Sequence, residues 1–481
     1  MSVILEEIPH APSPAALFAG LHDLPHAFFL DSGLSAGGLG AYSFIGFDPF
    51  LIFTAKARAI TITRDGRTET HTGDPLSELQ SLLRRYAPPT PSPVPALSSS
   101  LSALSSPPPI PFTGGAVGFF GYELCTQLEK LPRTSPDDLP GVPDLAFAFY
   151  DGLIAHEHST ARTWLVANPV HTTPPDAILA RLRAAVTTPS SPKPKCHLLG
   201  DTLPLPAPAV PTSNFTPAAY TAAIARIKAY IASGDVYQVN LTQRFSTPLP
   251  CPSFALYERL RARSAAPFAS YLNFGPVQIA SSSPERFLRI HGRHVETRPI
   301  KGTRRRDATP AADTRLASEL LASPKDRAEL LMIVDLERND LGRVCEYGSV
   351  RVDDLWHLES HPTVHHLVAN VSGTLRPGCD IIDCLRATFP GGSITGAPKI
   401  RAMQIIDELE PHRRHLYTGA IGYIGFNGDC DLNIAIRTLT CTGGHAYYSV
   451  GGGIVWDSDP AAEYQETLDK GRALHESLTA P

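Results

Sequence analysis

The sequence predicts an α+β fold built on antiparallel sheets. Helix starts are marked by a capping side chain followed by proline at 216–217, 323–324 and 459–460. Between these helices, segments rich in β-branched and aromatic residues follow one another in runs, which is typical of paired strands. The chain carries neither the glycine motif of a dinucleotide site nor a P-loop. Runs of strands with helices inserted favour this class over a parallel, alternating sheet.

The N-terminal region is expected to consist mainly of strands and turns. Its elements are strands within 41–50, 51–66 and 112–123 and a closing helix at 176–186. Two Pro/Ser-rich stretches interrupt the chain: 86–112 is interpreted as a surface excursion, and 187–215 as a seam. We therefore expect an N-terminal region at 1–190, a Pro-rich linker at 191–214 and a C-terminal region at 215–478.

The C-terminal region alternates clear helices with strands. Helices are expected from Thr216–Pro217 to about Ser233, from Ser323–Pro324 to 341, from 397 to 410 and from 461 to 478. Strands are expected at 236–246, 276–283, 293–299, 417–426, 430–440 and 446–456.

Composition excludes several classes of protein. The 481 residues carry 42 Lys+Arg and 47 Asp+Glu, so the net charge of −5 lacks the basic field of a nucleic-acid binder. The first basic residue other than histidine is Lys56, which argues against a secretory or transit segment. No apolar run approaches a membrane span, and the eight cysteines have no metal-ligand spacing. We expect a cytoplasmic protein with reduced thiols and no membrane or nucleic-acid partner.

Paired acidic residues give the first chemical signal. Glu463 and Glu466 lie on one face of the last expected helix, with Lys470 one turn further. A divalent cation such as Mg²⁺ would relieve the repulsion between these carboxylates, and Glu329 is a candidate for a further ligand. A solvated helix face with an ordinary Glu–Lys pair explains the same pattern.

Glycine-rich segments give a second signal. The loop 390–399 combines three glycines and two hydroxyls with a helix start at Lys399, a design suited to binding an anion. The segment 451–453 offers a backbone that a ligand could approach closely. Simple turn chemistry or a bulge would account for both.

Glu285 and Lys301 form a third candidate group, because a short hairpin between them could bring them face to face. An acid beside a desolvated amine can transfer protons or provide a nucleophile, although a structural salt bridge is the alternative. A zinc site among His357, His361 and His365 is disfavoured, since the proline at 362 interrupts a helical spacing.

These motifs together resemble the chorismate-utilising enzymes, a family that includes the large components of anthranilate synthase and aminodeoxychorismate synthase as well as isochorismate and salicylate synthases. The resemblance is carried by 234–245, 281–287, 297–303, 325–344, 389–410, 417–424, 433–438 and 450–467, with a weaker match at 42–49 and 114–123. It implies two packed antiparallel sheets surrounded by helices, with both regions in one globule.

The resemblance also implies roles for individual residues. Glu329 and Glu466, with Glu463 as a neighbour, would bind Mg²⁺, which would offset the charge of chorismate. The positions matching the substrate site are Gly302, Thr303, Thr395, Lys399, Tyr417, Arg437, Gly451, Gly452 and Gly453. His366 matches a histidine near the departing groups.

Two positions distinguish the members of the family. Water-adding members carry a lysine where this chain has Gln238, and anthranilate synthases resemble PIAGT where it has PIKGT. Lys301 matches the lysine that attacks the ring in aminodeoxychorismate synthases, with Glu285 as general acid and base. We therefore expect amination of chorismate to 4-amino-4-deoxychorismate. Anthranilate synthesis is the alternative, while a zinc hydrolase and a non-catalytic binding protein are less consistent with the motifs.

The chain lacks the nucleophile elbow of a glutaminase, so a separate glutamine amidotransferase subunit is expected to supply ammonia. The resemblance further implies a tryptophan pocket, with a structural rather than a feedback role. Its positions are Ser32, Tyr42, Ser43, Phe44, Ile45, Pro267, Phe268 and Ala269.

Overall fold

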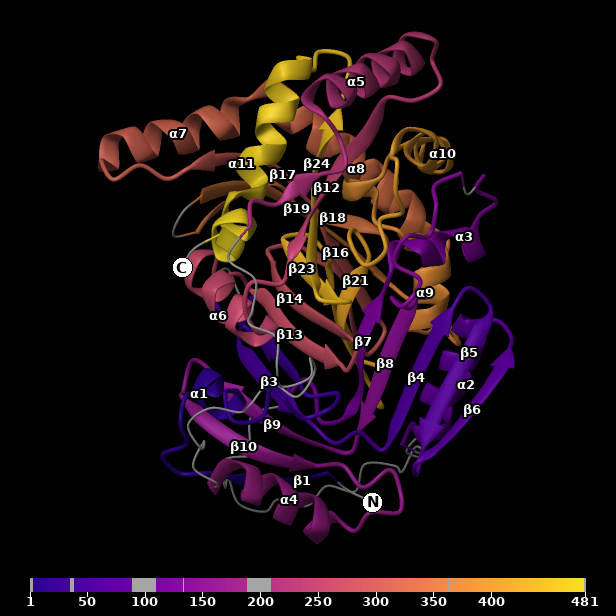
Figure 1. Cartoon of the computed structure of the whole chain (residues 1–481), viewed down its shortest axis with the longest axis vertical. Helices are drawn as coiled ribbons and strands as arrows, with labels where there is room; N and C mark the ends of the chain where they lie inside the picture. The colour runs from indigo at the N-terminus through magenta and orange to yellow at the C-terminus, as the bar shows by residue number, and fades with distance from the viewer. Residues whose placement is uncertain are drawn as a thin grey trace.

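Two large sheets organise the chain in a computed structural model that describes residues 3–34, 39–88, 110–132, 134–187, 209–361 and 364–479. Each sheet contains 12 strands that pair antiparallel (Figure 1). Both hold strands from the N-terminal and the C-terminal region, because β2 pairs with β13 in one and β7 pairs with β21 in the other. The predicted α+β class with two packed sheets is confirmed.

The first sheet runs in the order β1 (Ile4–Glu7), β10 (Arg162–Ala167), β9 (Gly152–Glu157), β3 (Tyr42–Gly46), β2 (Phe28–Asp31), β13 (Phe268–Phe274), β14 (Val277–Ser283), β23 (Thr438–Thr442), β24 (His445–Ile454), β12 (Gln238–Pro248) and β11 (Thr212–Ser213), with β20 (Gly396–Ala397) on β12. The second sheet runs in the order β17 (Ile300–Arg305), β19 (Val364–Thr374), β16 (His294–Arg298), β15 (Arg286–His291), β22 (Cys430–Ile434), β21 (Ala420–Gly425), β7 (Gly115–Phe120), β8 (Leu145–Tyr150), β4 (Leu51–Lys56), β5 (Ala59–Arg64) and β6 (Arg67–Thr72), with β18 (Arg351–Ser360) on β19.

Apolar clusters hold these layers together. Phe28 and Phe44 of the first sheet share one cluster with Phe119 and Tyr423 of the second, so the two sheets pack on each other there. The outer face of each sheet is covered by helices (Figure 1). The helices are α1 (Pro14–Phe18), α2 (Pro75–Tyr86), α3 (Cys125–Leu128), α4 (Pro175–Thr187), α5 (Pro217–Ala232), α6 (Ser253–Arg263), α7 (Pro310–Ala322), α8 (Pro324–Gly342), α9 (Ile381–Thr388), α10 (Lys399–Leu409) and α11 (Pro460–Thr479), with single 3₁₀ turns at Tyr122–Leu124 and Gly392–Ile394.

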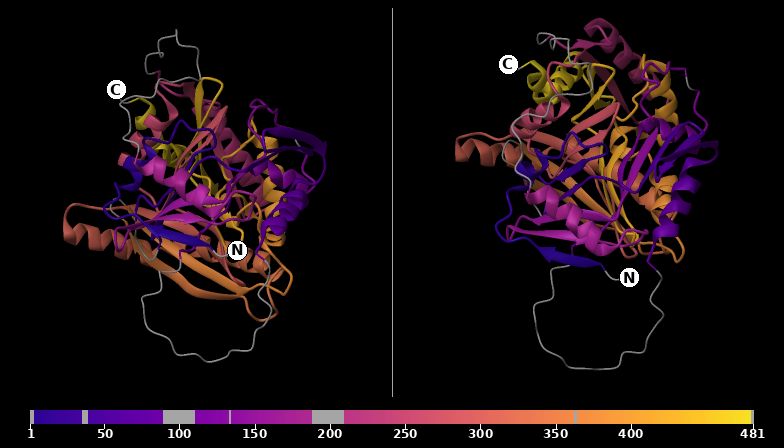
Figure 2. Two further views of the ribbon diagram at one scale, coloured as in Figure 1. Left: turned by 90° about the horizontal axis from the view of Figure 1, so that it is seen from below. Right: turned by 60° about the horizontal axis from the view of Figure 1, so that its bottom comes forward.

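The expected capping signals act as helix starts. The Thr216 hydroxyl accepts a hydrogen bond from the Ala219 amide at α5, and the Ser323 hydroxyl accepts one from the Asp326 amide at α8. Helix α7 projects from the body of the molecule in all views (Figures 1 and 2). Of its side chains only Leu320 is buried, which explains why the sequence pattern does not reveal this helix.

Two of the expected β-rich segments each contain two strands. The segment 51–66 forms the hairpin of β4 and β5 around Ala57, whose φ is +48°. The segment 430–440 divides into β22 and β23, which belong to different sheets, and Arg437 lies between them with φ of +50°. The prediction of one continuous strand at 430–440 is wrong, because the chain crosses from one sheet to the other at this point.

The described residues leave parts of the sequence interpretation open. The stretch 89–109 within the expected excursion, and 188–208 within the expected seam, lie outside them. The boundaries 1–190, 191–214 and 215–478 therefore stay a prediction. No helix in the described part of the chain is long and apolar enough to cross a bilayer.

Candidate functional site

Lys301 lies on edge strand β17, whose pairing with β19 is irregular between Lys301 and Thr303. The intervening Gly302 has φ of +78°, and a Cβ there would lie 2.9 Å from Asp326 of α8. Only glycine suits this bulge. Burial lowers the pKa of Lys301, while the charges of Glu329 and Glu285 act in the opposite direction. The bulge thus sets a partly buried amine among carboxylates.

Glu285 lies in the bend between β14 and β15 and is almost completely buried. Its Oε1 accepts hydrogen bonds from the Ser393 hydroxyl at 2.7 Å and from the Ile300 amide at 3.4 Å. Burial raises the pKa of Glu285, and the Ser393 bond only partly offsets this effect. Glu285 can therefore exchange a proton more readily than an exposed glutamate.

Three further carboxylates converge from α8 and α11. A Cβ on Gly452 would lie 3.2 Å from Glu463 Oε2 and 3.8 Å from both Glu466 Oε1 and Lys470 Nζ. The Lys470 ammonium lies 2.6 Å from Glu466 and donates to the Gly451 carbonyl at 3.1 Å. Burial raises the pKa of Glu329 on α8, where the charge of Glu463 acts in the same direction.

This donor set fits Mg²⁺. In the region that the structure describes, no three His, Cys, Asp or Glu side chains form a ready-made metal cluster. Mg²⁺ commonly takes only one or two protein carboxylates and completes its shell with water and substrate oxygens. The Lys470 ammonium already forms an ion pair with Glu466. The group of carboxylates formed by Glu329, Glu463 and Glu466 is therefore a favourable environment for a cation.

The glycines of β24 form a wall without side chains. They pair with β12, where Gly453 lies opposite Asn240 and Gly451 opposite Thr242. A Cβ on Gly453 would lie 2.9 Å from the Gln238 side chain, and one on Gly451 would lie 2.5 Å from a carbonyl of β12. Substitution would therefore push the two strands apart.

Arg437 occupies the crossing between the sheets, in the left-handed backbone region. Among the described residues, no carboxylate pairs with its guanidinium. Burial lowers the pKa of Arg437, and Glu285 opposes the shift. A partly buried and unpaired guanidinium can bind an incoming carboxylate through two parallel hydrogen bonds.

His366 and Thr303 are directly paired across β19 and β17. His366 Nδ1 and Thr303 Oγ1 share a hydrogen bond of 2.9 Å. Burial lowers the pKa of His366 to about 3, and the nearby charge of Arg437 adds to the effect. The imidazole is therefore neutral at physiological pH. The neighbouring His365 is bound to Ser360 and Asp313 instead.

Besides Ser393, both Thr395 and Lys399 of the loop 390–399 have partners within the protein. The Lys399 ammonium binds Asp340 at 2.5 Å and the Thr388 carbonyl at 2.7 Å. The Thr395 hydroxyl is buried and donates to the Gly391 carbonyl at 2.9 Å. Both side chains thus support the loop from within.

Tyr417 lies three residues after the buried Arg414, whose side chain connects several elements of the fold. Its amide donates to the Arg414 carbonyl at 3.1 Å, and burial raises the pKa of its hydroxyl. The Arg414 guanidinium binds both oxygens of Glu410 and donates to the Ile394 and Asn240 carbonyls. The Glu-x-x-x-Arg spacing of 410–414 was the available signal for this pair, and the sequence interpretation missed it.

Two amides of β12 are also candidate site residues. In the described part of the chain, neither polar atom of the Gln238 amide nor Asn240 Oδ1 has a hydrogen-bond partner, although both side chains are buried. Buried polar atoms are rarely left unpaired without a reason. Gln238 and Asn240 alternate in the sequence with the apolar residues Val239 and Leu241. This alternation of polar and apolar residues was the signal that could have identified Asn240 as a candidate site residue.

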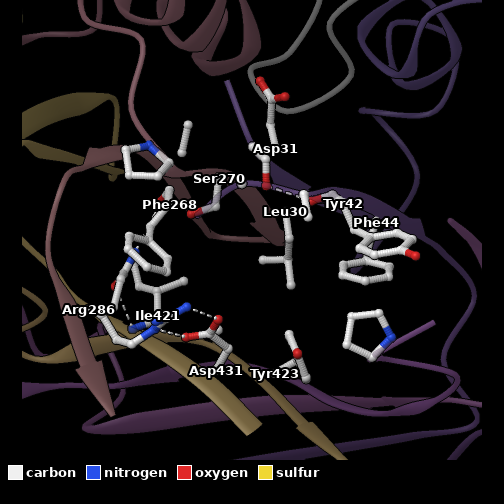
Figure 3. Close-up of a pocket in the computed structure, with 18 of the residues that line it drawn as sticks. Leu30, Asp31, Tyr42, Phe44, Phe268, Ser270, Arg286, Ile421, Tyr423 and Asp431 are labelled. Atoms are coloured by element: carbon white, nitrogen blue, oxygen red, sulfur yellow. Dashed lines mark hydrogen bonds and ion pairs between the residues drawn. The ribbon is translucent and has the colours of Figure 1, made fainter. Parts of the chain in front are cut away.

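The expected tryptophan positions surround a cavity of about 140 Å³ (Figure 3). Six of them line it, namely Ser32, Tyr42, Phe44, Pro267, Phe268 and Ala269. Ser43 binds His158 and Ile45 lies in the core behind, because successive residues of β3 face opposite sides. Figure 3 shows the Arg286–Asp431 ion pair at the wall, and Asp31 Oδ1 and Ser270 Oγ have no partner among the described residues.

Comparison with known proteins identifies the family of this chain. Residues 40–476 match the family described as chorismate binding enzyme. Aminodeoxychorismate synthase component 1 of Salmonella typhimurium is 41% identical over 97% of both chains. Anthranilate synthase component 1 of Streptomyces coelicolor is 40% identical over 96% of this chain and 86% of its own. The crystal structure of anthranilate synthase component I from Streptococcus pneumoniae superposes with a TM-score of 0.75, at 30% identity and with 93% of each chain covered. The chain therefore belongs to the family of chorismate binding enzymes.

Proposed function

We propose that this enzyme is component 1 of a cytoplasmic aminodeoxychorismate synthase, which converts chorismate and ammonia to 4-amino-4-deoxychorismate for p-aminobenzoate and folate synthesis. The observation that carries the proposal is Lys301, a partly buried amine whose pKa is lowered by burial. A neutral amine is a nucleophile and an ammonium is not. Aminodeoxychorismate synthases and anthranilate synthases of the family are about equally similar to this chain in sequence. We therefore base the choice between the two activities on the lysine at position 301.

The reaction begins with covalent addition. The neutral Lys301 amine attacks C2 of chorismate, both conjugated ring double bonds shift by one position, and the C4 hydroxyl leaves as water with a proton from Glu285. The raised pKa of Glu285 favours the protonated form that this step requires.

Ammonia completes the exchange. It attacks C4, both double bonds shift back, and the bond between C2 and the Lys301 nitrogen breaks. Glu285 accepts the excess proton and is ready for another cycle. The enolpyruvyl group stays on the ring, which separates this product from anthranilate.

Binding groups hold the ring in place. The unpaired Arg437 guanidinium is suited to a carboxylate of chorismate, and the backbone of Gly451–Gly453 allows close approach of the ring. The neutral His366, oriented by Thr303, can form a hydrogen bond to the departing hydroxyl without adding charge.

Glu329 and Glu466 would hold Mg²⁺, with Glu463 beside them. When bound, the metal ion neutralises the carboxylates of protein and substrate, which would otherwise repel each other.

A separate glutamine amidotransferase subunit would supply ammonia. The names of the relatives, component 1, support a partner subunit. Excess ammonium should replace that subunit in vitro.

The decisive experiment incubates the purified chain with chorismate, Mg²⁺ and ammonium and identifies the product by mass. We expect 4-amino-4-deoxychorismate and, without ammonium, an adduct on the peptide that contains Lys301. Lys301→Ala should abolish both, while the exposed Lys130→Ala should change neither. Release of fluorescent anthranilate, or full ammonia-dependent activity in Lys301→Ala, would overturn the proposal.

For the cavity of Figure 3 we propose a tryptophan that stabilises the fold. Its polar atoms Asp31 Oδ1 and Ser270 Oγ lack partners among the described residues and could bind the amino acid's polar end. Calorimetry with tryptophan tests binding, and the amination assay tests inhibition. Tight binding accompanied by inhibition would show a regulatory site instead.

A further inference from the structure

The loop 390–399 packs tightly against helix α8. A Cβ on Gly392 would lie 2.8 Å from the Leu336 side chain of α8, so only a residue without a side chain allows this approach. The packing brings the next residue, Ser393, against Glu285, and both residues are only 5% exposed. The loop that the sequence pattern suggested for binding an anion therefore meets a carboxyl group of the protein itself.

Glu285 is held through its backbone and through one of its carboxyl oxygens. Its carbonyl accepts a hydrogen bond from the Ile434 amide at 3.0 Å. Its Oε1 accepts one from the Ser393 hydroxyl at 2.7 Å and one from the Ile300 amide at 3.4 Å. Because Ile300 directly precedes Lys301, this oxygen joins the loop to the strand that carries the proposed nucleophile.

The two carboxyl oxygens of Glu285 are therefore not equivalent. A carboxyl oxygen has two lone pairs, and two donors already occupy those of Oε1. Among the described residues, Oε2 has no hydrogen-bond partner. When Glu285 is protonated, its proton is thus carried by Oε2, which is the oxygen left free for a substrate.

Several charges surround this carboxyl group without touching it. Lys301 on β17, Lys470 on α11 and Arg437 at the crossing between the sheets favour its ionised form. Burial and the acidic Glu337 of α8 act in the opposite direction. Within the described chain none of these groups lies at ion-pair distance from Glu285. The two hydrogen bonds to Oε1 are therefore the direct contacts that orient its side chain.

We propose that Ser393 is a positioning residue for Glu285, which fixes Oε1 so that Oε2 exchanges the proton with the substrate. The inference rests on the proposed function, in which Oε2–H protonates the leaving C4 hydroxyl and Oε2 later accepts a proton from the added ammonia. Both transfers need the same oxygen at the same place, because proton transfer requires a short and well-aligned hydrogen bond. Ser393 itself does not touch the reacting atoms.

The first test separates positioning from binding. Ser393→Ala should lower kcat of ammonium-dependent amination about tenfold or more, because a misplaced acid transfers its proton slowly. KM for chorismate should stay unchanged. In a chain that already carries Glu285→Ala, the same substitution should cause no further loss of the residual rate. The matched control is Ser81→Ala, which removes an exposed hydroxyl on α2 and should change neither constant.

The second test observes the carboxyl group directly, without chorismate. Glu285→Gln identifies the infrared band of the protonated Glu285 carboxyl group, whose loss is then followed as the pH is raised. The Ser393 hydrogen bond favours the ionised form, so in Ser393→Ala the band should persist to higher pH. The surrounding charges are the same in both chains, so the shift reports the hydrogen bond. Ser393→Cys, which keeps a side chain of similar shape with a weaker donor, should shift the band in the same direction by less.

Each result decides between the alternatives. An unchanged band position, or an unchanged kcat in Ser393→Ala, would overturn the positioning role. A raised KM with unchanged kcat would make Ser393 a substrate contact instead, and an equal loss of rate in the Glu285→Ala chain would show that the loop acts independently of Glu285. Failure of the unmodified chain to form 4-amino-4-deoxychorismate from ammonium would refute the proposed function, while the infrared titration still tests the contact between Ser393 and Glu285.

Discussion

Replacing Arg414 by methionine should destabilise the protein more than any surface change. The guanidinium binds Glu410 through two hydrogen bonds of 2.9 and 2.7 Å, and both side chains are at most 5% exposed. Removing one partner of a buried ion pair costs about 3–5 kcal/mol, because the other charge stays buried without compensation. The Ile394 and Asn240 carbonyls also lose donors. We therefore expect the upper part of this range in urea unfolding.

A double-mutant cycle tests the electrostatic origin of the loss. Glu410→Gln should also destabilise, but Arg414→Met/Glu410→Gln should recover about 2 kcal/mol or more relative to the sum of the single changes. The control is Arg315→Met on α7, whose exposed pair with Glu319 should contribute less than about 0.5 kcal/mol. Additive losses at 410 and 414 would refute the argument that the buried pair, rather than packing, is the source.

Four further predictions concern the site. The rate of adduct formation should rise with pH and reach half its maximum below the 10.5 of ordinary lysine, because burial favours the neutral Lys301 amine; a midpoint at or above 10.5 would contradict this. His366→Asn should slow amination without changing the profile between pH 5 and 8, since a pKa of about 3 keeps His366 neutral there. Gly453→Ala should raise KM for chorismate about tenfold through contact with Gln238, and Gln238→Ala in the same chain should recover part of it, as steady-state kinetics can show. EDTA should abolish adduct formation as detected by mass, and Mg²⁺ should restore it.

Local signals explain which parts of the fold the sequence predicts. Helices α5 and α8 begin with a capping hydroxyl and proline, and both start where expected. The division of 430–440 has no such signal, since neither glycine nor proline marks Arg437. The backbone turns there because the chain passes from one sheet to the other. That requirement is set by tertiary packing and not by neighbouring residues.

The candidate site shows the same division between local and long-range information. The spacing of Glu463 and Glu466 predicts two carboxylates on one helix face, and the structure brings both to Gly452. The interpretation of the loop 390–399 could not include Asp340, which lies 59 positions from Lys399 in sequence. A nearby cation stabilises the buried Asp340 carboxylate, and this long-range interaction favours the position of the Lys399 ammonium.

Lys399 and Lys301 together show why one lysine of this site is suited to nucleophilic attack. Both lysines lie near acidic groups, so their positions in the sequence do not indicate which amine is the better nucleophile. The Lys399 side chain is held by Asp340 and by the Thr388 carbonyl, so both of these contacts occupy its nitrogen. Lys301 has no carboxylate at ion-pair distance among the described residues, and burial lowers its pKa despite the charges of Glu329 and Glu285. The chemical difference between the two amines thus arises from one close ion pair, which Lys399 has and Lys301 lacks.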